Sequence, residues 1–145
     1  MISPMKFAAS LSIESDVSQL EKMRNFVEET ASNLTQNTEA IDDLILALNE
    51  AVTNVIVHGY QHNHGLIQVF VGATPETLVT VLYDRAPAYD PTCTPVPDTT
   101  LPLEKRAPGG LGVHMMRHLT DEMHYRRTLD GENELTLIKK TEPRS

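Results

Sequence analysis

The chain has 145 residues and a formal net charge of −8 at pH 7. Its length fits a single domain over residues 1–145, and its acidity argues against nucleic acid or a membrane surface as a direct partner, because both attract clustered Lys and Arg. A single cysteine, Cys93, excludes an intrachain disulfide, and no long apolar run or basic leader is present, so we expect a cytoplasmic protein.

The first third of the chain predicts one strand and two helices. Apolar residues alternate with polar or small ones between residues 6 and 13, which is typical of a strand with one buried face. Helical spacing then predicts a helix from Leu20 to about Asn33. Asn37 or Thr38 can cap a second helix, and Gly59 is placed to end it.

The second predicted helix carries a carboxylate and an amide one turn apart, Glu50 and Asn54. At 100° per residue they share one side with Asp43 and Ala47. The opposite side is apolar and is formed by Ile41, Ile45, Leu48, Val52 and Ile56. From this stretch alone, Glu50 and Asn54 are either solvated surface residues or the lining of a pocket that handles a metal ion or a proton.

The rest of the chain predicts two hairpins separated by a loop and a short helix. Residues 66–72 and 77–83 form the first hairpin, and residues 121–127 and 133–139 form the second. Proline-rich residues follow Asp84, and a loop of this length inside a compact domain is usually a functional lid or disordered. We place the lid at about residues 91–108.

Glycines follow the lid directly, in the run Gly109-Gly110-Leu111-Gly112. Backbone N–H groups at such a helix start can bind phosphate, although a hinge or close helix packing explains the glycines equally well. Arg106, and to a lesser degree Lys105, lies shortly before this run, and its positive charge favours the phosphate-site interpretation over the structural one. Asp84, at a strand end, either accepts a hydrogen bond from a purine amine or is a turn residue beside proline.

Three motifs in this order resemble those of the GHKL (Bergerat-fold) ATPases, in the form found in bacterial anti-sigma factor serine kinases. Residues 49–54 (NEAVTN) with 58–60 (HGY) look like the N-box of that family. Residues 84–91 (DRAPAYDP) resemble the G1 box, and residues 109–116 (GGLGVHMM) resemble the G2 box, with Asp121 in the expected place after its helix. The resemblance covers nearly the whole chain.

The resemblance implies a role for each matching residue. Glu50 would be the general base, and Asn54 would be the ligand of Mg²⁺. Asp84 would bind the adenine amine of ATP, next to Ala86. Residues 109–112, including Leu111, would approach the phosphates, and Arg106 would neutralise charge on the transferred phosphoryl group.

One departure concerns the G1 box, which usually reads Asp-x-Gly-x-Gly in the superfamily. Here Ala86 and Ala88 occupy the glycine positions, so any positive φ there would be strained. A related variant is seen within the anti-sigma subgroup, and we interpret the alanines as a subgroup feature that lowers the expectation of tight ATP binding.

By this resemblance we expect an α/β two-layer sandwich with a mixed, largely antiparallel sheet of about five strands and three helices on one face. The expected activity is that of an ATP- and Mg²⁺-dependent serine/threonine kinase that phosphorylates an anti-sigma factor antagonist and sequesters a sigma factor. By analogy we also expect a homodimer. Two alternatives remain, a non-catalytic binding module with the same fold and a stand-alone ATP hydrolase.

Overall fold

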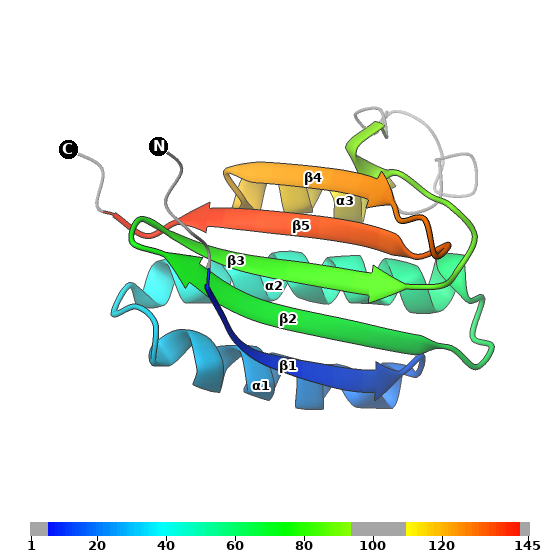
Figure 1. The fold of residues 1–145 in the computed structure, drawn as a ribbon, viewed down its shortest axis with the longest axis horizontal. Coiled ribbons are helices and arrows are strands. Elements are labelled where there is room, and N and C mark those ends of the chain that lie inside the picture. Colours follow the sequence, from blue (N-terminus) through cyan, green and yellow to red (C-terminus); the bar gives the residue numbers. More distant parts are fainter. Residues whose placement is uncertain (1–5, 94–109, 143–145) are drawn as a thin grey trace.

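A computed structural model of the chain describes residues 6–93 and 110–142. It contains one sheet of five strands in the order β1-β2-β3-β5-β4 (Figure 1). The strands are β1 (Lys6–Glu14), β2 (Leu66–Thr74), β3 (Thr77–Asp84), β4 (Glu122–Arg127) and β5 (Asn133–Lys140). Both predicted hairpins are therefore confirmed.

Every pairing in this sheet is antiparallel, so the expectation of a mixed sheet was wrong. The reason lies in where β5 inserts. Strands β3 and β4 run in the same direction, but β5 lies between them and pairs with each in the antiparallel sense.

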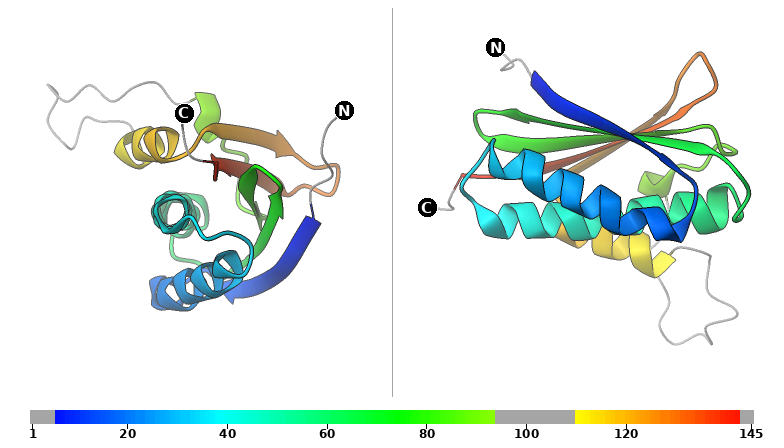
Figure 2. Two further views of the ribbon diagram at one scale, coloured as in Figure 1. Left: turned by 90° about the vertical axis from the view of Figure 1, so that its left-hand side faces the viewer. Right: turned by 90° about the horizontal axis from the view of Figure 1, so that it is seen from below.

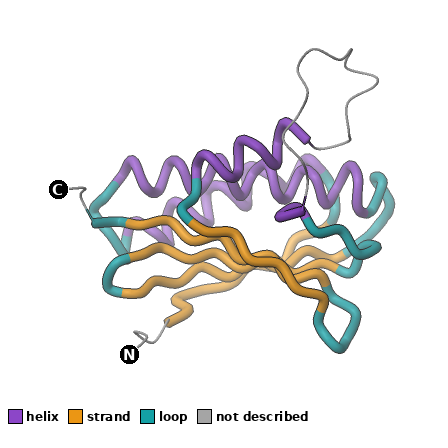
Figure 3. The backbone as a smooth tube through the Cα atoms, turned by 90° about the horizontal axis from the view of Figure 1, so that it is seen from above, coloured by secondary structure: helices purple, strands orange, loops and turns teal. Residues whose placement is uncertain are grey.

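Three helices cover one face of the sheet: α1 (Leu20–Ser32), α2 (Thr38–Asn54) and α3 (Gly110–Leu119). Figure 2 shows them on the same side of the strands, and Figure 3 shows the two layers from another direction. Short 3-10 turns lie at Val17–Gln19 and Pro91–Cys93, and a π-helical turn at Val55–Gly59 continues α2. Asn37 caps α2, because its Oδ1 accepts a hydrogen bond of 3.0 Å from the N–H of Ala40.

The core lies between the helices and the helix-facing side of the sheet. Leu44 and Leu48 of α2, Val69 of β2 and Leu137 of β5 are completely buried there. Ala47 is also completely buried, although it lies on the same side of the helical wheel as Glu50 and Asn54. Helix α3 packs against α2, and its Gly112 lies beside Glu50 and Asn54 on that same side.

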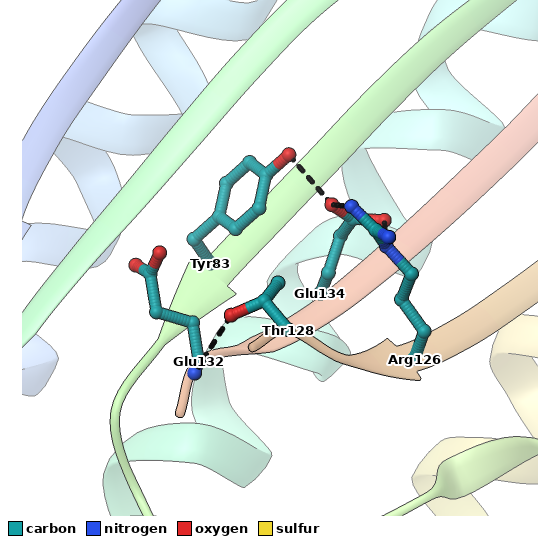
Figure 4. A network of polar contacts seen from close by, with 5 residues as sticks. All are labelled: Tyr83, Arg126, Thr128, Glu132 and Glu134. Carbon is teal, nitrogen blue, oxygen red and sulfur yellow. Dashed lines mark hydrogen bonds and ion pairs between the residues drawn. The ribbon is translucent and has the colours of Figure 1, made fainter. Parts of the chain in front are cut away.

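The far face of the sheet carries a polar network (Figure 4). The Tyr83 hydroxyl donates to Glu134 Oε2 at 2.8 Å, and Arg126 pairs with Glu134 Oε1 at 2.7 Å. Burial and the Glu134 bond raise the pKa of Tyr83 to about 12, while the Arg126 hydrogen bonds lower the pKa of Glu134. This network lies on the opposite side of the sheet from the helices.

Among the described residues, no helix is both long enough and apolar enough to span a membrane.

Candidate functional site

Helix α2 changes its geometry immediately after Asn54. Residues Val55–Gly59 form a π-helical turn, and Tyr60 N–H donates to Val55 O at 2.7 Å. The predicted end of the helix at Gly59 is confirmed, but its last turn is wider than an α-helical one. Such turns are frequent at functional sites, because the extra residue redirects the side chains that follow.

Glu50 and Asn54 meet the first turn of α3 at Gly112. A Cβ atom at Gly112 would lie 2.9 Å from Glu50 Oε2 and 3.7 Å from Asn54 Nδ2. The absence of a side chain at Gly112 therefore leaves room for both groups. Sequence reasoning placed these three residues in two separate motifs, and the packing of α3 on α2 brings them together.

A pocket with a volume of about 590 Å³ opens beside this junction. Its lining is largely apolar and includes Asn54 from α2 together with Asp84 and Ala86 at the end of β3. Its size is typical of a site for a small molecule. Glu50 and Gly112 do not line the pocket itself but lie next to Asn54 at its edge.

Asp84 places a buried carboxylate in this pocket, where it is 5% exposed. Burial raises its pKa, and hydrogen bonds to Asn133 and Ala86 partly oppose that effect. Oδ1 accepts from Asn133 Nδ2 at 2.8 Å and from Ala86 N–H at 3.0 Å. Because both bonds go to Oδ1, Oδ2 is the oxygen that remains to accept a hydrogen bond from a bound molecule.

Asn133 organises this corner of the pocket and was missed in the sequence. Its Nδ2 also donates to Ala86 O at 3.0 Å, and its Oδ1 accepts from the Tyr125 hydroxyl at 2.5 Å. Arg127 Nη1 donates to Ala86 O at 2.8 Å. The pairing of β3 with β5 sets Asn133 opposite Asp84, and no local sequence signal marks such a pairing.

The alanines in the G1-like segment are not strained. Within the described ranges, the only residues other than glycine with positive φ are Gln61 and His62. Ala86 is 2% exposed, and its methyl group lies above Gly59, where a Cβ would be 3.0 Å away. Gly59, at the end of the π-helical turn, thus makes room for Ala86 in the segment that follows β3.

The predicted site also includes residues of the lid and of the glycine run. Arg106, Gly109 and most of the lid at 91–108 lie outside the described residues. Gly110 and Leu111 belong to the first turn of α3, but the Leu111 side chain is not described. The structure thus assembles the predicted residues from the helix, the strand end and Gly112 only.

The residues present fit Mg²⁺ bound together with phosphate. The side-chain nitrogen of Asn54 is buried and has no hydrogen-bond partner in the part of the chain described. An amide at this position can offer either its oxygen or its nitrogen, since the two are exchanged by a flip of the side chain. Mg²⁺ usually takes one or two protein oxygens plus phosphate oxygens, which is compatible with a single asparagine ligand.

Comparison with known proteins decides the family. The profile of the histidine kinase-like ATPase domain matches residues 13–139. The chain belongs to this family. The match runs from the end of β1 to the end of β5, so it includes every described residue of the pocket and both helices that carry the predicted site.

Within this family, the chain is similar to named bacterial protein kinases and an anti-sigma factor. The chain is 33% identical over 103 residues to the serine/threonine-protein kinase BtrW of Bordetella bronchiseptica, covering 70% of this chain and 72% of BtrW. It is 30% identical over 105 residues to the serine-protein kinase RsbW of Bacillus licheniformis, covering 65% and 62%, respectively. It is 31% identical over 100 residues to the anti-sigma F factor of Clostridium acetobutylicum, covering 64% and 65%. The resemblance to anti-sigma factor kinases is confirmed.

A solved structure supports the fold. The RsbU and RsbW domains of Rv1364c from Mycobacterium tuberculosis superpose with a TM-score of 0.62 at 19% identity. The superposition covers 94% of this chain and 34% of that one. The α/β fold of this chain is therefore shared with that structure.

Proposed function

We propose that the chain is an ATP- and Mg²⁺-dependent protein serine/threonine kinase that acts as an anti-sigma regulatory factor. Its substrate would be an anti-sigma factor antagonist, and its second partner would be a sigma factor. The relatives named as serine kinases and anti-sigma factors support this proposal. The carrying observation is the junction at Gly112, which joins a carboxylate and an amide at the edge of a pocket containing a buried aspartate.

Each side chain has a separate task in this proposal. Asp84 Oδ2 accepts a hydrogen bond from the exocyclic amine of adenine, while the surrounding apolar side chains contact the adenine ring. Asn54 holds Mg²⁺, which supplies charge neutralisation at the phosphates when bound. Glu50, one turn earlier on α2, accepts the proton of the serine hydroxyl that attacks the terminal phosphate. The serine oxygen bonds to the terminal phosphorus while the bond from that phosphorus to the bridging oxygen breaks, and ADP leaves. Positioning and electrostatics supply most of the catalysis in phosphoryl transfer.

The test is transfer of labelled phosphate from ATP to candidate antagonist proteins encoded in the same genome. Glu50→Gln keeps the size of the side chain but cannot accept the proton, and we expect it to lower the rate about 100-fold or more. Glu29→Gln, on the exposed side of α1, is the matched control and should transfer at the parental rate. Equal rates for the parent and Glu50→Gln would contradict the assignment of the base.

The second candidate is a module that regulates its partner by contact alone. Ala86 and Ala88 favour it, since they replace glycines of the usual motif. Retention of both Glu50 and Asn54 speaks against it, because a pure adaptor has no chemical use for the pair. Binding of a sigma factor or antagonist without any transfer, under conditions where ATP is bound, would favour this second function.

The expected homodimer stays a prediction. Light scattering on the purified chain tests it, and a mass of one chain at micromolar concentration would contradict it.

A further inference from the structure

The Tyr60 hydroxyl bridges two segments that sequence analysis kept apart. It accepts a hydrogen bond of 2.7 Å from the N–H of Arg85 and donates one of 2.9 Å to Leu66 O. Tyr60 caps the π-helical turn that continues α2, whereas Arg85 directly follows Asp84 at the end of β3. One side chain therefore connects the helix of Glu50 and Asn54 to the segment of Asp84.

The hydroxyl is suited to both bonds. The ordinary pKa of a phenol already keeps this proton in place at neutral pH, and burial raises the pKa of Tyr60 further, so the hydroxyl can donate to Leu66 O. Its oxygen accepts the Arg85 N–H at the same time, which a phenol can do because it is both donor and acceptor. Neither bond is available to phenylalanine at this position.

Two glycines allow close contacts around Tyr60. Gly65 lies against the Tyr60 ring, and Gly59 lies against Ala86. A Cβ at Gly65 would lie 2.3 Å from Cε1 and Cζ of the Tyr60 ring, which is impossible without movement. A Cβ at Gly59 would lie 3.0 Å from the Cβ of Ala86. The Tyr60 ring is thus covered by Gly65. Next to it in the chain, Gly59 at the helix end contacts Ala86 in the segment after β3.

The π-helical turn determines where Tyr60 lies. A wider turn delays the end of the helix, and the N–H of Tyr60 reaches back to Val55 O rather than to Ile56 O. The chain then passes through left-handed residues, Gln61 at φ 54° and His62 at φ 64°. A local geometry of this kind persists only where surrounding contacts hold it, and the Tyr60 bonds are such contacts.

Resting on the nucleotide-binding function proposed above, we propose that Tyr60 is a positioning residue: its hydroxyl holds the Asp84–Ala86 segment in register with Glu50 and Asn54. The base of a nucleotide is bound by the strand segment, and its phosphates are bound by the helix side. A single nucleotide can bind to the strand segment and to the helix side at the same time only if the distance between these two parts of the site is fixed. Asn133 and Arg127 hold the segment against β4 and β5, and Tyr60 sets its distance from α2.

Adenosine and Mg-ATP separate this role from a merely structural one. Adenosine uses the strand segment alone, whereas Mg-ATP needs both sides at once. We therefore expect Tyr60→Phe to weaken Mg-ATP binding about tenfold, the scale of one lost hydrogen bond, and to change adenosine binding by less than about twofold. Calorimetric titration of the purified chain measures both affinities.

Tyr83→Phe is the matched control, because it removes a hydroxyl on the far face of the sheet that bonds only Glu134 among the hydrogen bonds described for it. It should leave both affinities within about twofold of the parent. A second readout needs no nucleotide: hydrogen exchange at the Arg85 amide should accelerate in Tyr60→Phe and stay unchanged in Tyr83→Phe.

Three results would overturn the inference. Unchanged Mg-ATP affinity in Tyr60→Phe, or unchanged exchange at Arg85, would show that the hydroxyl does not hold the segment. Equal weakening of adenosine and Mg-ATP would indicate general damage to the fold. If the parent chain bound neither ligand, the proposed nucleotide function itself would fail, and that result is distinct because it appears before any substitution is made.

Discussion

The side-chain amide of Asn133 donates a hydrogen bond of 2.8 Å to Oδ1 of Asp84, and both residues are buried. This bond orients the carboxylate proposed to accept the adenine amine. Asn133→Ala would leave Ala86 O and the Tyr125 hydroxyl without this partner. We expect a loss of about 1–3 kcal/mol in the free energy of unfolding and about tenfold in adenosine affinity.

Urea denaturation and calorimetry measure the two effects of Asn133→Ala. Asn25→Ala, at an exposed position of α1, is the control and should change neither quantity. An adenosine affinity equal to that of the parent would mean that Asp84 needs no help from Asn133.

We expect adenosine binding to depend on pH through Asp84. Burial raises its folded-state pKa, so the folded chain holds this proton more tightly than the unfolded chain does. The group therefore favours folding at low pH, and this contribution is lost as the pH rises from the ordinary value of 3.8 through the raised pKa. Binding follows the opposite direction, because the charged carboxylate is the better acceptor for the amine.

We accordingly expect adenosine affinity to fall as the pH is lowered from about 7 toward 4, with a midpoint above the ordinary aspartate pKa. Asp84→Asn should bind weakly at every pH and show a much flatter profile. An unchanged slope in Asp84→Asn would assign the titration to another group.

We expect a substitution at Gly112 to affect stability and catalysis in different directions. Gly112→Ala places a methyl group 2.9 Å from Glu50 Oε2 and must displace that carboxylate. Alanine is also the better helix former, by up to about 1 kcal/mol inside a helix. We expect an unfolding midpoint equal to or above that of the parent, together with phosphate transfer lowered about tenfold or more. Unimpaired transfer would mean that Glu50 can act from more than one position.

Gly59 and Ala86 form a pair whose sizes are complementary. Gly59→Ala would bring two methyl groups to 3.0 Å and push the strand segment away from the helix. We expect a loss of about 1 kcal/mol in Mg-ATP binding, or about fivefold in affinity. The double variant Gly59→Ala with Ala86→Gly removes this contact and should recover most of the loss. A double variant as weak as the single one would show that the contact is not the cause.

Much of the fold follows from local patterns. Alternation in β1, the apolar spacing of the helices and the Asn37 cap all depend on residues close in the chain, and the structure agrees with them. The burial of Ala47 was not predicted, because a helical wheel cannot show that α3 packs against that side of α2. The fully antiparallel sheet results from the insertion of β5 between β3 and β4. Strand order is a property of the whole fold, and no local sequence pattern predicts it.

The residues of the candidate site also differ in whether local sequence patterns predicted them. Glu50, Asn54 and Asp84 were found through motifs, since each lies in a recognisable stretch. Asn133 was missed, and Tyr60 was named only as part of the N-box without a role of its own. Their partners are distant in the sequence, 49 residues from Asn133 to Asp84 and 25 from Tyr60 to Arg85. Hydrogen bonds of this range depend on strand register and on the π-helical turn, neither of which has a local signature.

The central claim is that Asn54 and Asp84 bind one Mg-ATP molecule between α2 and the end of β3. Calorimetric titration of ATP, with and without Mg²⁺, into the parent and into Asn54→Ala tests it most directly, with Asn33→Ala on the exposed end of α1 as control. We predict that Asn54→Ala weakens binding chiefly when Mg²⁺ is present. No heat from the parent at millimolar ATP, or equal weakening with and without the metal, would contradict the account.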